Sequence, residues 1–441
     1  MTERTDAAGA QHRAGGFFYP LLRRMIAVTP AEVPALAWAW LYIFSVLSSY
    51  YIMRPIRDQM GVAGGVNNLQ WLFTGTLIGM LLLNVPFAYL VKTLPRTRFI
   101  PITYRFFAAN ILIFAAVLHF TDAAHSVWIG RAFFIWISVF NLFVVSVFWA
   151  LVVDVFNSEQ GKRLFGFIAA GATIGAICGS SITATLGRHV PTPFLLIGAT
   201  CLLEVAVLSV RGLSRLSAAL HARPAESADR PVGGHVLAGI THPFKSPYLA
   251  NVSLFMLLFS ITATFLYFQQ ASLVRDNFPD RGSQTAFFAT IDMAVNTLTL
   301  IVQLFFTGRI LGWLGVGLTL TILPMLTLVG FGTLALMPAV STLVVFQVMR
   351  RSCDYAIARP TREVLYTVVV REDRYKAKNF IDTVVYRGGD QIGAWAYALI
   401  AMLGFGTPTI AAIAIGLAII WLFNGWWLGH RQETMAAKAT P

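Results

Sequence analysis

The sequence predicts an all-α integral membrane protein of about twelve transmembrane helices, arranged as two six-helix bundles. Three observations lead to this fold class. The chain of 441 residues is 57% hydrophobic and only 12% charged, which is too apolar for an ordinary soluble protein. Apolar runs of about twenty residues, the length that crosses a hydrocarbon core of about 30 Å, recur between short polar stretches. One long polar segment divides these runs into two equal sets.

The polar segment between Arg211 and Pro247 is rich in charged residues, Pro and Gly, and we predict a linker there. Equal numbers of spans on its two sides suit a pair of related bundles. The expected divisions are a cytoplasmic N-terminal tail over 1–32, an N-terminal bundle over 33–211, a cytoplasmic linker over 212–248, a C-terminal bundle over 249–429 and a cytoplasmic C-terminal tail over 430–441. The predicted spans are 33–54, 69–91, 98–120, 125–153, 164–187, 193–211, 249–274, 284–311, 315–336, 339–358, 379–403 and 407–429.

The net charge of +13 is distributed as a topology signal. Most Lys and Arg residues fall in every second loop, together with both tails, which places these segments and both termini in the cytoplasm of an inner membrane. Residues 1–32 lack the apolar core and cleavage site of a signal peptide, so we expect the first span to be retained. The basic charge therefore does not indicate a nucleic-acid partner. The three cysteines lie inside predicted spans without paired spacing, which supports neither a disulfide framework nor a zinc site.

The first span carries charges at its far end. Tyr50 and Tyr51 close the apolar run, and Arg54, Arg57 and Asp58 follow. Two guanidiniums at this position are costly if they face lipid and cost little if they line a wet cavity. One interpretation is an interfacial anchor with arginines reaching the headgroups. The other is a cavity lining, and buried charges elsewhere in the chain favour it.

Small residues follow in the fifth span. Gly171, Gly175 and Gly179 repeat at a spacing of four, which lets one helix press its backbone against a neighbour. We predict helix packing here rather than ligand chemistry.

The tenth and eleventh spans carry charges near the membrane midplane. Arg350 and Arg351 lie in the tenth span, and Asp354 follows one turn later, where it can pair with either arginine. Asp390 lies at a similar depth in the eleventh span, with Arg387 one turn below it. We therefore predict an ion pair between Arg350 or Arg351 and Asp390 as a bridge between helices.

Further charges lie in the fourth and eighth spans. Arg131 is near the outer end of the fourth span and Asp154 near its inner end, close to Lys162 and Arg163. This inner group is expected to form either a cytoplasmic gate or a helix cap. Asp292 in the eighth span, like the aspartate of the eleventh, could carry a proton if burial raises its pKa.

The arginines of the first, fourth and tenth spans outnumber the aspartates of the same spans. A surplus of guanidiniums in a low-dielectric cavity favours an anion, and their planar fork suits phosphate or carboxylate. The alternative is that the charges are structural ion pairs that clamp helices together, which suits Arg105, Glu204 and Arg387 best. The sequence contains no glycine-rich phosphate loop, metal-spaced His/Cys set or nucleophile elbow, so we expect neither an enzyme nor a cofactor.

Three segments carry a resemblance to a known family. They are Arg54-Pro-Ile-Arg57-Asp58; Phe148-Trp149 followed by Asp154, Glu159, Lys162 and Arg163; and Arg351-Ser-Cys-Asp354-Tyr355 continuing to Pro360-Thr-Arg-Glu363 and Tyr366. In order and spacing they resemble the ATP/ADP (nucleotide) translocase family of plastids and intracellular bacteria. The likeness continues through Lys376, Lys378, Asp382 and Gly393.

This resemblance implies a fold like that of the major facilitator superfamily, with a central cavity lined by the first, fourth, seventh and tenth helices. It also implies that Arg57 stands at the family's nucleotide-binding lysine and keeps its charge. The chain departs from the family at three charged positions. Ile137 replaces a glutamate, and Asp354 and Asp390 replace lysines. The expected cargo is therefore an anionic or zwitterionic solute, of which ATP and ADP are one case.

We predict a secondary transporter of the inner membrane that works by alternating access and moves a nucleotide-like or phosphorylated small solute. Arg54, Arg57 and Arg351 are expected to hold its negative group, with Arg131 and Asp354 as further candidates. Asp354 and Asp390 would orient the arginines or carry a coupling proton. Gating or coupling roles are expected for Asp58, Asp154, Lys162, Arg163, Arg350, Arg387, Asp390 and Asp292. The alternatives are a proton-coupled exporter of other small molecules or lipids and a non-transporting membrane sensor or assembly factor.

Overall fold

The computed structural model describes residues 28–94, 96–121, 126–156, 158–220, 246–369, 377–378 and 380–439, and the regular structure of these residues is helical. Ten of the described helices are long and apolar enough to cross a membrane. Two further helical paths, 340–365 and 381–402, are divided by π-helical segments, and their α-helical parts are correspondingly shorter. The protein is thus an all-α, multi-pass membrane protein, as the sequence predicts.

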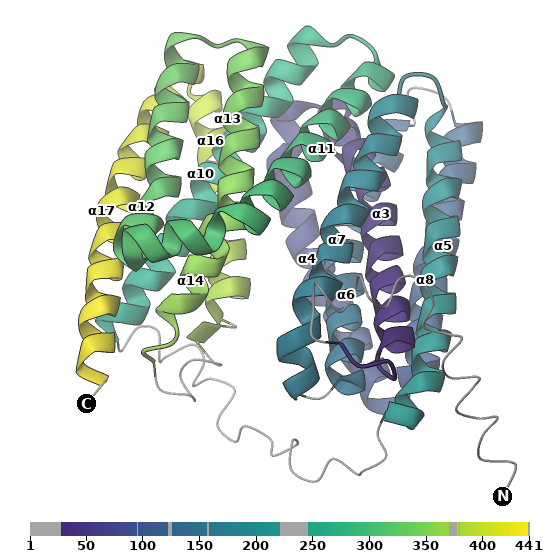
Figure 1. Ribbon diagram of the computed structural model, residues 1–441. Helices are drawn as coiled ribbons and strands as arrows, with labels where there is room; N and C mark the ends of the chain where they lie inside the picture. The colour runs from purple at the N-terminus through teal and green to yellow at the C-terminus, as the bar shows by residue number, and fades with distance from the viewer. Residues whose placement is uncertain are drawn as a thin grey trace, which may run out of the picture.

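The first six spans form one bundle (Figure 1). Its helices are α3 (Val33–Ala63), α4 (Leu69–Thr93), α5 (Arg96–Phe120), α6 (Ser126–Val155), α7 (Ser158–Leu186) and α8 (Thr192–Leu220), with a short 3-10 turn, η1 (Val66–Asn68), between α3 and α4. The predicted first span ends at 54, whereas α3 continues to Ala63. Arg54, Arg57 and Asp58 therefore lie inside this helix, and the interfacial-anchor interpretation is wrong.

The remaining helices form the second bundle (Figure 1). They are α10 (Pro247–Asn277), α11 (Arg281–Phe305), α12 (Thr307–Leu336), α13 (Val340–Cys353), the π-helical η2 (Asp354–Ala358), α14 (Arg359–Leu365), the π-helical η3 (Ile381–Val385), α16 (Tyr386–Met402) and α17 (Thr407–Ala439). Helix α3 begins and α17 ends at the same end of the molecule, which we call the terminal end; the opposite end is the distal end.

The predicted span 284–311 is wrong at its end. Helix α11 stops at Phe305, and the following helix is kinked at Gly315, which has a φ of 68°. This left-handed conformation favours glycine because no Cβ is present to clash. Beyond the kink, the backbone N–H groups of Val316 and Gly317 donate to the Glu433 carboxylate at 3.1 and 3.2 Å. A carboxylate here satisfies the free N–H groups of a restarting helix and suits its dipole.

The small residues of α7 pack as predicted. A Cβ atom at Gly175 or Gly179 would overlap the backbone carbonyl of Phe44 or Ser48 on α3, so only glycine permits this approach. The Ser48 hydroxyl uses the short distance to donate to the Gly175 carbonyl at 3.0 Å. This seam fixes α3, and with it the arginines near its distal end, inside the first bundle.

The two bundles meet in the distal half of the molecule. The Thr74 hydroxyl of α4 donates to Gln391 of α16 at 2.9 Å, and the rings of Trp71 and Trp395 lie 4.8 Å apart between the same helices. At the start of α11, Arg281 donates to Ser126 at the start of α6. Apolar side chains of both bundles form a common core around these contacts. A cavity lies between the bundles beside this junction.

A charged cavity between the two helix bundles

The cavity has a volume of about 650 Å³ and is lined by helices of both bundles. The first bundle contributes residues of α3, α4, α6 and α7, and the second contributes α10, α11, α13, η2, the first residue of α14 and α16. Among the described residues, its wall holds six arginines and four aspartates, so its formal charge is positive. They are Arg54, Arg57, Arg350, Arg351, Arg359 and Arg387, and Asp58, Asp292, Asp354 and Asp390.

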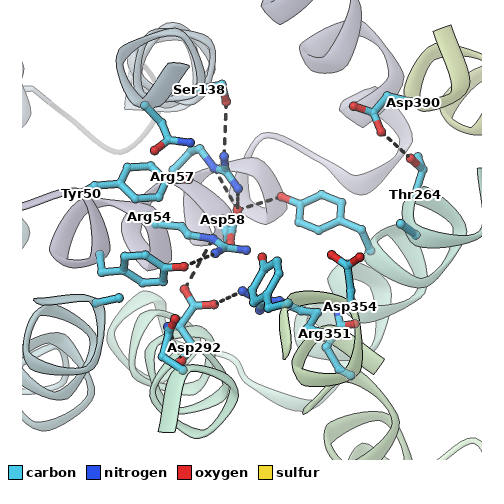
Figure 2. A pocket seen from close by; sticks show the side chains of 18 of the residues that line it. Tyr50, Arg54, Arg57, Asp58, Ser138, Thr264, Asp292, Arg351, Asp354 and Asp390 are labelled. Carbon is cyan, nitrogen blue, oxygen red and sulfur yellow. Dashed lines mark hydrogen bonds and ion pairs between the residues drawn. The ribbon is translucent and has the colours of Figure 1, made fainter. Parts of the chain in front are cut away.

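A three-residue charge cluster joins α3 to the second bundle (Figure 2). Asp292 of α11 is 2% exposed and lies between two guanidiniums, with Arg351 Nη2 2.7 Å from Oδ1 and Arg54 Nε 3.5 Å from Oδ2. Neither of these two contacts has the alignment of a hydrogen bond, although both are ion pairs. One carboxylate therefore pairs with two cations, and the cluster keeps a net positive charge toward the cavity.

Arg57 forms a second cluster beside the first. Its Nη2 and Nε donate to Asp58 Oδ1 at 2.6 and 3.0 Å, and its guanidinium lies over the ring of Phe134 at 5.1 Å. The phenol of Tyr267 on α10 donates to the same carboxylate oxygen at 3.0 Å. Arg57 also donates to Ser138 of α6 at 3.4 Å. The cluster thus fixes Arg57 on three sides and links the two bundles through Asp58 and Tyr267.

The sequence predicts that Asp354 pairs with Arg350 or Arg351, and this prediction is wrong. Asp354 pairs with Arg359, whose Nε lies 3.2 Å from Oδ2. The reason is the π-helix over 354–358. A π-turn closes over five residues instead of four, which brings position i+5 rather than i+4 back to Asp354. Arg359 also stacks on Tyr355 at 4.4 Å and remains half exposed in the cavity wall.

Arg350 is turned into the second bundle. It is 3% exposed and donates to the Phe259 carbonyl, the Thr262 hydroxyl and the Thr327 hydroxyl at 3.1 to 3.2 Å. Its guanidinium also lies over the Phe259 ring at 5.2 Å. These neutral partners saturate most of its donors, so Arg350 fixes α13 against α10 and α12.

Asp390 also has partners other than those predicted. Arg387 Nη1, one turn away on α16, lies 3.2 Å from Oδ2, and the hydroxyls of Ser260 and Thr264 on α10 lie 2.6 and 3.4 Å from Oδ1. The predicted bridge from Arg350 or Arg351 to Asp390 is therefore wrong. Both arginines have partners on α10, α11 or α12, which lie closer to α13 than the carboxyl of α16 does.

Three other predicted site residues, Arg131, Asp154 and Arg163, do not line the cavity. Arg131 donates to the Gly64 carbonyl at 2.9 Å and stacks on Trp128 near the distal end, so it closes the end of α3 instead of facing a solute. Asp154 is exposed near the terminal end of α6. The Lys162 side chain lies outside the described residues.

Arg163 belongs to an ion pair at the terminal end. Its Nη2 lies 3.0 Å from Oε1 of Glu32, the residue before α3, and Gln160 donates to the same oxygen at 2.9 Å. Burial raises the pKa of Glu32, but hydrogen bonds from the Thr29 backbone, Arg163 and Gln160 outweigh it and hold this pKa below its usual value. The pair ties the start of α3 to α7.

Glu32→Gln is expected to lower thermal stability at neutral pH. A carboxyl whose pKa is lower in the folded than in the unfolded state stabilises the fold above its usual pKa of about 4.3, and this stabilisation disappears as the pH falls through the folded value. The melting temperatures of wild type and Glu32→Gln should therefore converge in acid. Asp276→Asn, at the exposed end of α10, serves as a control. A constant difference at every pH would contradict this prediction.

Several residues that line the cavity were not predicted from the sequence. The predicted tenth span ends at 358, but the helical path continues through Arg359 and places it in the wall. Tyr267 and the amides of Asn141, Gln270 and Gln347 also line the cavity. Their position inside long apolar spans was an available signal, because a buried amide or phenol needs a polar partner or water.

Comparisons with known proteins agree with this architecture. The sequence profile of the Major Facilitator Superfamily matches residues 21–350. Solved structures with a similar fold include nucleoside transporter NupG (TM-score 0.59, 16% identity, covering 91% of this chain and 99% of that one) and a bacterial homologue of the iron transporter ferroportin in an inward-facing state (TM-score 0.61, 12% identity, 89% and 98%). At these identities the likeness concerns the fold alone.

Curated relatives include ADP,ATP carrier protein 1 of Chlamydia trachomatis serovar D, 22% identical over 309 residues, and ADP,ATP carrier protein 1 of Chlamydia pneumoniae, 24% identical over 204 residues. The first match covers 61% of this chain and 58% of the relative, and the second covers 41% and 40%. The matched regions thus span between about two fifths and three fifths of these relatives.

Proposed function

The chain belongs to the Major Facilitator Superfamily and is a secondary transporter of a small molecule rather than an enzyme, and we propose that its substrate is an anionic, nucleotide-like or phosphorylated solute moved by exchange. The single observation that carries the proposal is the charge of the cavity. Six arginines face four aspartates there, and Arg54 and Arg351 share one carboxylate between them.

The arrangement of three guanidiniums supports an anion at one place. Arg54 and Arg57 come from α3 and Arg351 from α13, so the two bundles supply cations to a common volume (Figure 2). Each is only 14 to 16% exposed, which places it where water screens charge weakly. A guanidinium fork donates two parallel hydrogen bonds to a phosphate or a carboxylate, so these side chains can bind either kind of anion.

The size of the cavity and the relatives support a nucleotide-like solute. A volume of about 650 Å³ falls within the usual range of small-molecule sites, and the curated relatives carry the name ADP,ATP carrier. Of the departures from that family, Ile137 is fully buried and does not line the cavity. Asp354 and Asp390 are each neutralised by a neighbouring arginine.

Alternating access requires the junction between the bundles to open. The described contacts there lie in the distal half, and they include a shared apolar core, a few hydrogen bonds, ring contacts and the Asp58–Tyr267 and Arg54–Asp292 links. With both termini in the cytoplasm of an inner membrane, the distal end faces outward and this conformation is closed to the outside. Separation of the distal contacts would expose the same cavity to the other side.

Uptake of labelled ADP into proteoliposomes tests the function. At equal pH on both sides of the membrane, vesicles preloaded with unlabelled ADP should take up the label, and empty vesicles should take up little, because exchange needs a solute on both sides. Absence of ADP uptake in both kinds of vesicle, together with uncoupler-sensitive transport of other small molecules, would instead indicate a proton-coupled exporter. A thermal-shift panel of nucleotides, sugar phosphates and carboxylates without any response would indicate a membrane protein that transports none of them.

A further inference from the structure

The carboxyl of Asp390 lies in a cage of oxygen atoms at the edge of the cavity. It is 7% exposed, and Ser260 Oγ and Thr264 Oγ1 of the neighbouring helix α10 both approach the same carboxylate oxygen, Oδ1. Figure 2 shows the contact with Thr264. Its second oxygen, Oδ2, faces Arg387 of its own helix. The mechanism of anion binding by the Arg54–Asp292–Arg351 cluster makes no use of this carboxyl.

The hydrogen-bond donors and acceptors around Asp390 are consistent with a neutral carboxyl. The Ser260 hydroxyl has one hydrogen but lies 2.8 Å from the Tyr386 carbonyl and 2.6 Å from Asp390 Oδ1. A carbonyl oxygen only accepts, so a hydroxyl that donates to Tyr386 receives its second hydrogen bond from a protonated Asp390. The Thr264 hydroxyl likewise has an acceptor elsewhere, the Ser260 carbonyl at 3.0 Å. Every hydrogen then has an acceptor.

The same cage fits the ionised carboxyl when the hydroxyls rotate. Ser260 and Thr264 then donate to Oδ1, and Arg387 supplies the opposite charge at Oδ2. The two protonation states thus differ by hydroxyl rotation, without movement of a heavy atom. The cage is also tight, because Gly389 and Gly393 bring α16 against Ser260 and Thr264.

Arg387 decides which state is favoured. Arg387 and Tyr386 are the charged and titratable neighbours of Asp390 on its own helix, α16. From α10, Asp390 meets the hydroxyls of Ser260 and Thr264. Arg359 of α14 and Tyr355 of η2 face Tyr386 from the other side. The Arg387 side chain is 35% exposed in the cavity wall and can turn toward an anion there. A buried carboxylate that loses its cation is costly, and it becomes neutral by binding a proton.

We propose that Asp390 is a proton-binding site whose occupancy is set by Arg387. When a cavity anion engages Arg387, Asp390 takes a proton from cavity water; when the anion leaves, Arg387 returns and the proton is released. This coupling rests on the proposed anion transport. One proton then accompanies each anion, so balanced exchange moves no net proton, whereas net uptake follows a pH gradient. A gradient of one pH unit coupled to one proton supports about tenfold accumulation.

The first experiment needs no substrate. Infrared difference spectroscopy of the purified protein records the carbonyl stretch of protonated carboxyls as the pH is varied. We expect a titrating band that is lost in Asp390→Asn and kept in Asp276→Asn. Arg387→Gln imitates the capture of Arg387 by an anion. In this variant, the proton affinity of the carboxyl that gives the band should rise about tenfold or more. Arg105→Gln, which removes a half-exposed arginine on the outer face of α5, should leave it unchanged.

The second experiment uses labelled ADP as the probe. In wild-type proteoliposomes an inward proton gradient should drive accumulation, and in Asp390→Asn it should not; counterflow by this variant should also lose its dependence on pH. A band that survives in Asp390→Asn, or one that does not respond to Arg387→Gln, overturns the proposal. A sodium gradient that drives uptake in place of a proton gradient also overturns it. Absence of any ADP binding or uptake with the band changes intact refutes the nucleotide substrate and leaves the proton site established.

Discussion

Arg57→Ala is expected to reduce ADP counterflow by about thirtyfold or more while leaving a folded but less stable protein. Truncating one partner of a buried, hydrogen-bonded charge pair costs about 2–5 kcal/mol of binding, and each 1.4 kcal/mol corresponds to a factor of about ten. Arg57 meets these conditions because its side chain is only 14% exposed and its Nη2 lies 2.6 Å from Asp58. The bound anion would lose a cation that is already held in place.

Arg57→Ala leaves the buried Asp58 carboxylate without its cation, so its stability should fall by about 3–5 kcal/mol, while the partners of Arg57 keep other contacts. Asp58 retains the hydrogen bond from Tyr267, and Ser138 donates to the Phe134 carbonyl at 2.8 Å. Arg57→Lys is the informative companion, since it keeps the charge and removes the fork; we expect it to keep part of the activity.

Counterflow in proteoliposomes is the measurement for Arg57→Ala, with thermal unfolding in detergent as the test of folding. The matched control is Arg105→Ala, because Arg105 pairs with Glu204 at a half-exposed position outside the cavity. Counterflow by Arg57→Ala at the level of this control would remove Arg57 from the anion site.

The sequence was sufficient to identify the cavity residues that interrupt apolar runs. Arg54, Arg57, Arg351 and Asp390 stand in long spans where an exposed charge is costly, so the hydrophobic pattern alone indicates that they face a common interior. Spacing also predicted correctly that the α7 glycines press against a neighbouring helix, which the structure identifies as α3. Both inferences depend only on regular helical geometry, which the sequence pattern encodes directly.

The pairing of the charges could not be predicted in this way. Asp354 was expected to meet Arg350 or Arg351 because a regular helix brings positions three and four apart together. The π-helix at 354–358 shifts that relation by one residue and selects Arg359. Asp292 was predicted as a buried charge with a proton-carrying or coupling role, and not as the shared partner of two arginines. Such a three-way contact depends on how α3, α11 and α13 pack, which periodicity within one helix does not contain.

Asp292→Asn is expected to lower the stability of the ligand-free protein by about 3–5 kcal/mol, the usual cost of leaving a buried charge without its partner. Here the loss leaves two guanidiniums, those of Arg54 and Arg351, without a carboxylate. In the wild type, an anion that enters the cluster must compete with Asp292 for both. In the variant this competition is absent, so the anion should bind more tightly and restore more stability than it adds to the wild type.

Thermal unfolding with increasing ADP distinguishes the two roles of Asp292. The melting temperature of Asp292→Asn should start below that of the wild type and rise further with ADP, because a ligand that binds the folded state stabilises it in proportion to RT ln(1 + [L]/Kd). Asp276→Asn, at an exposed pair on α10, should follow the wild type at every concentration. If Asp292→Asn is destabilised but responds to ADP no more than the wild type, the carboxylate clamps helices and the anion binds elsewhere. A larger ADP response would show that Asp292 occupies, in the empty carrier, the position that the negative group of the solute takes when bound.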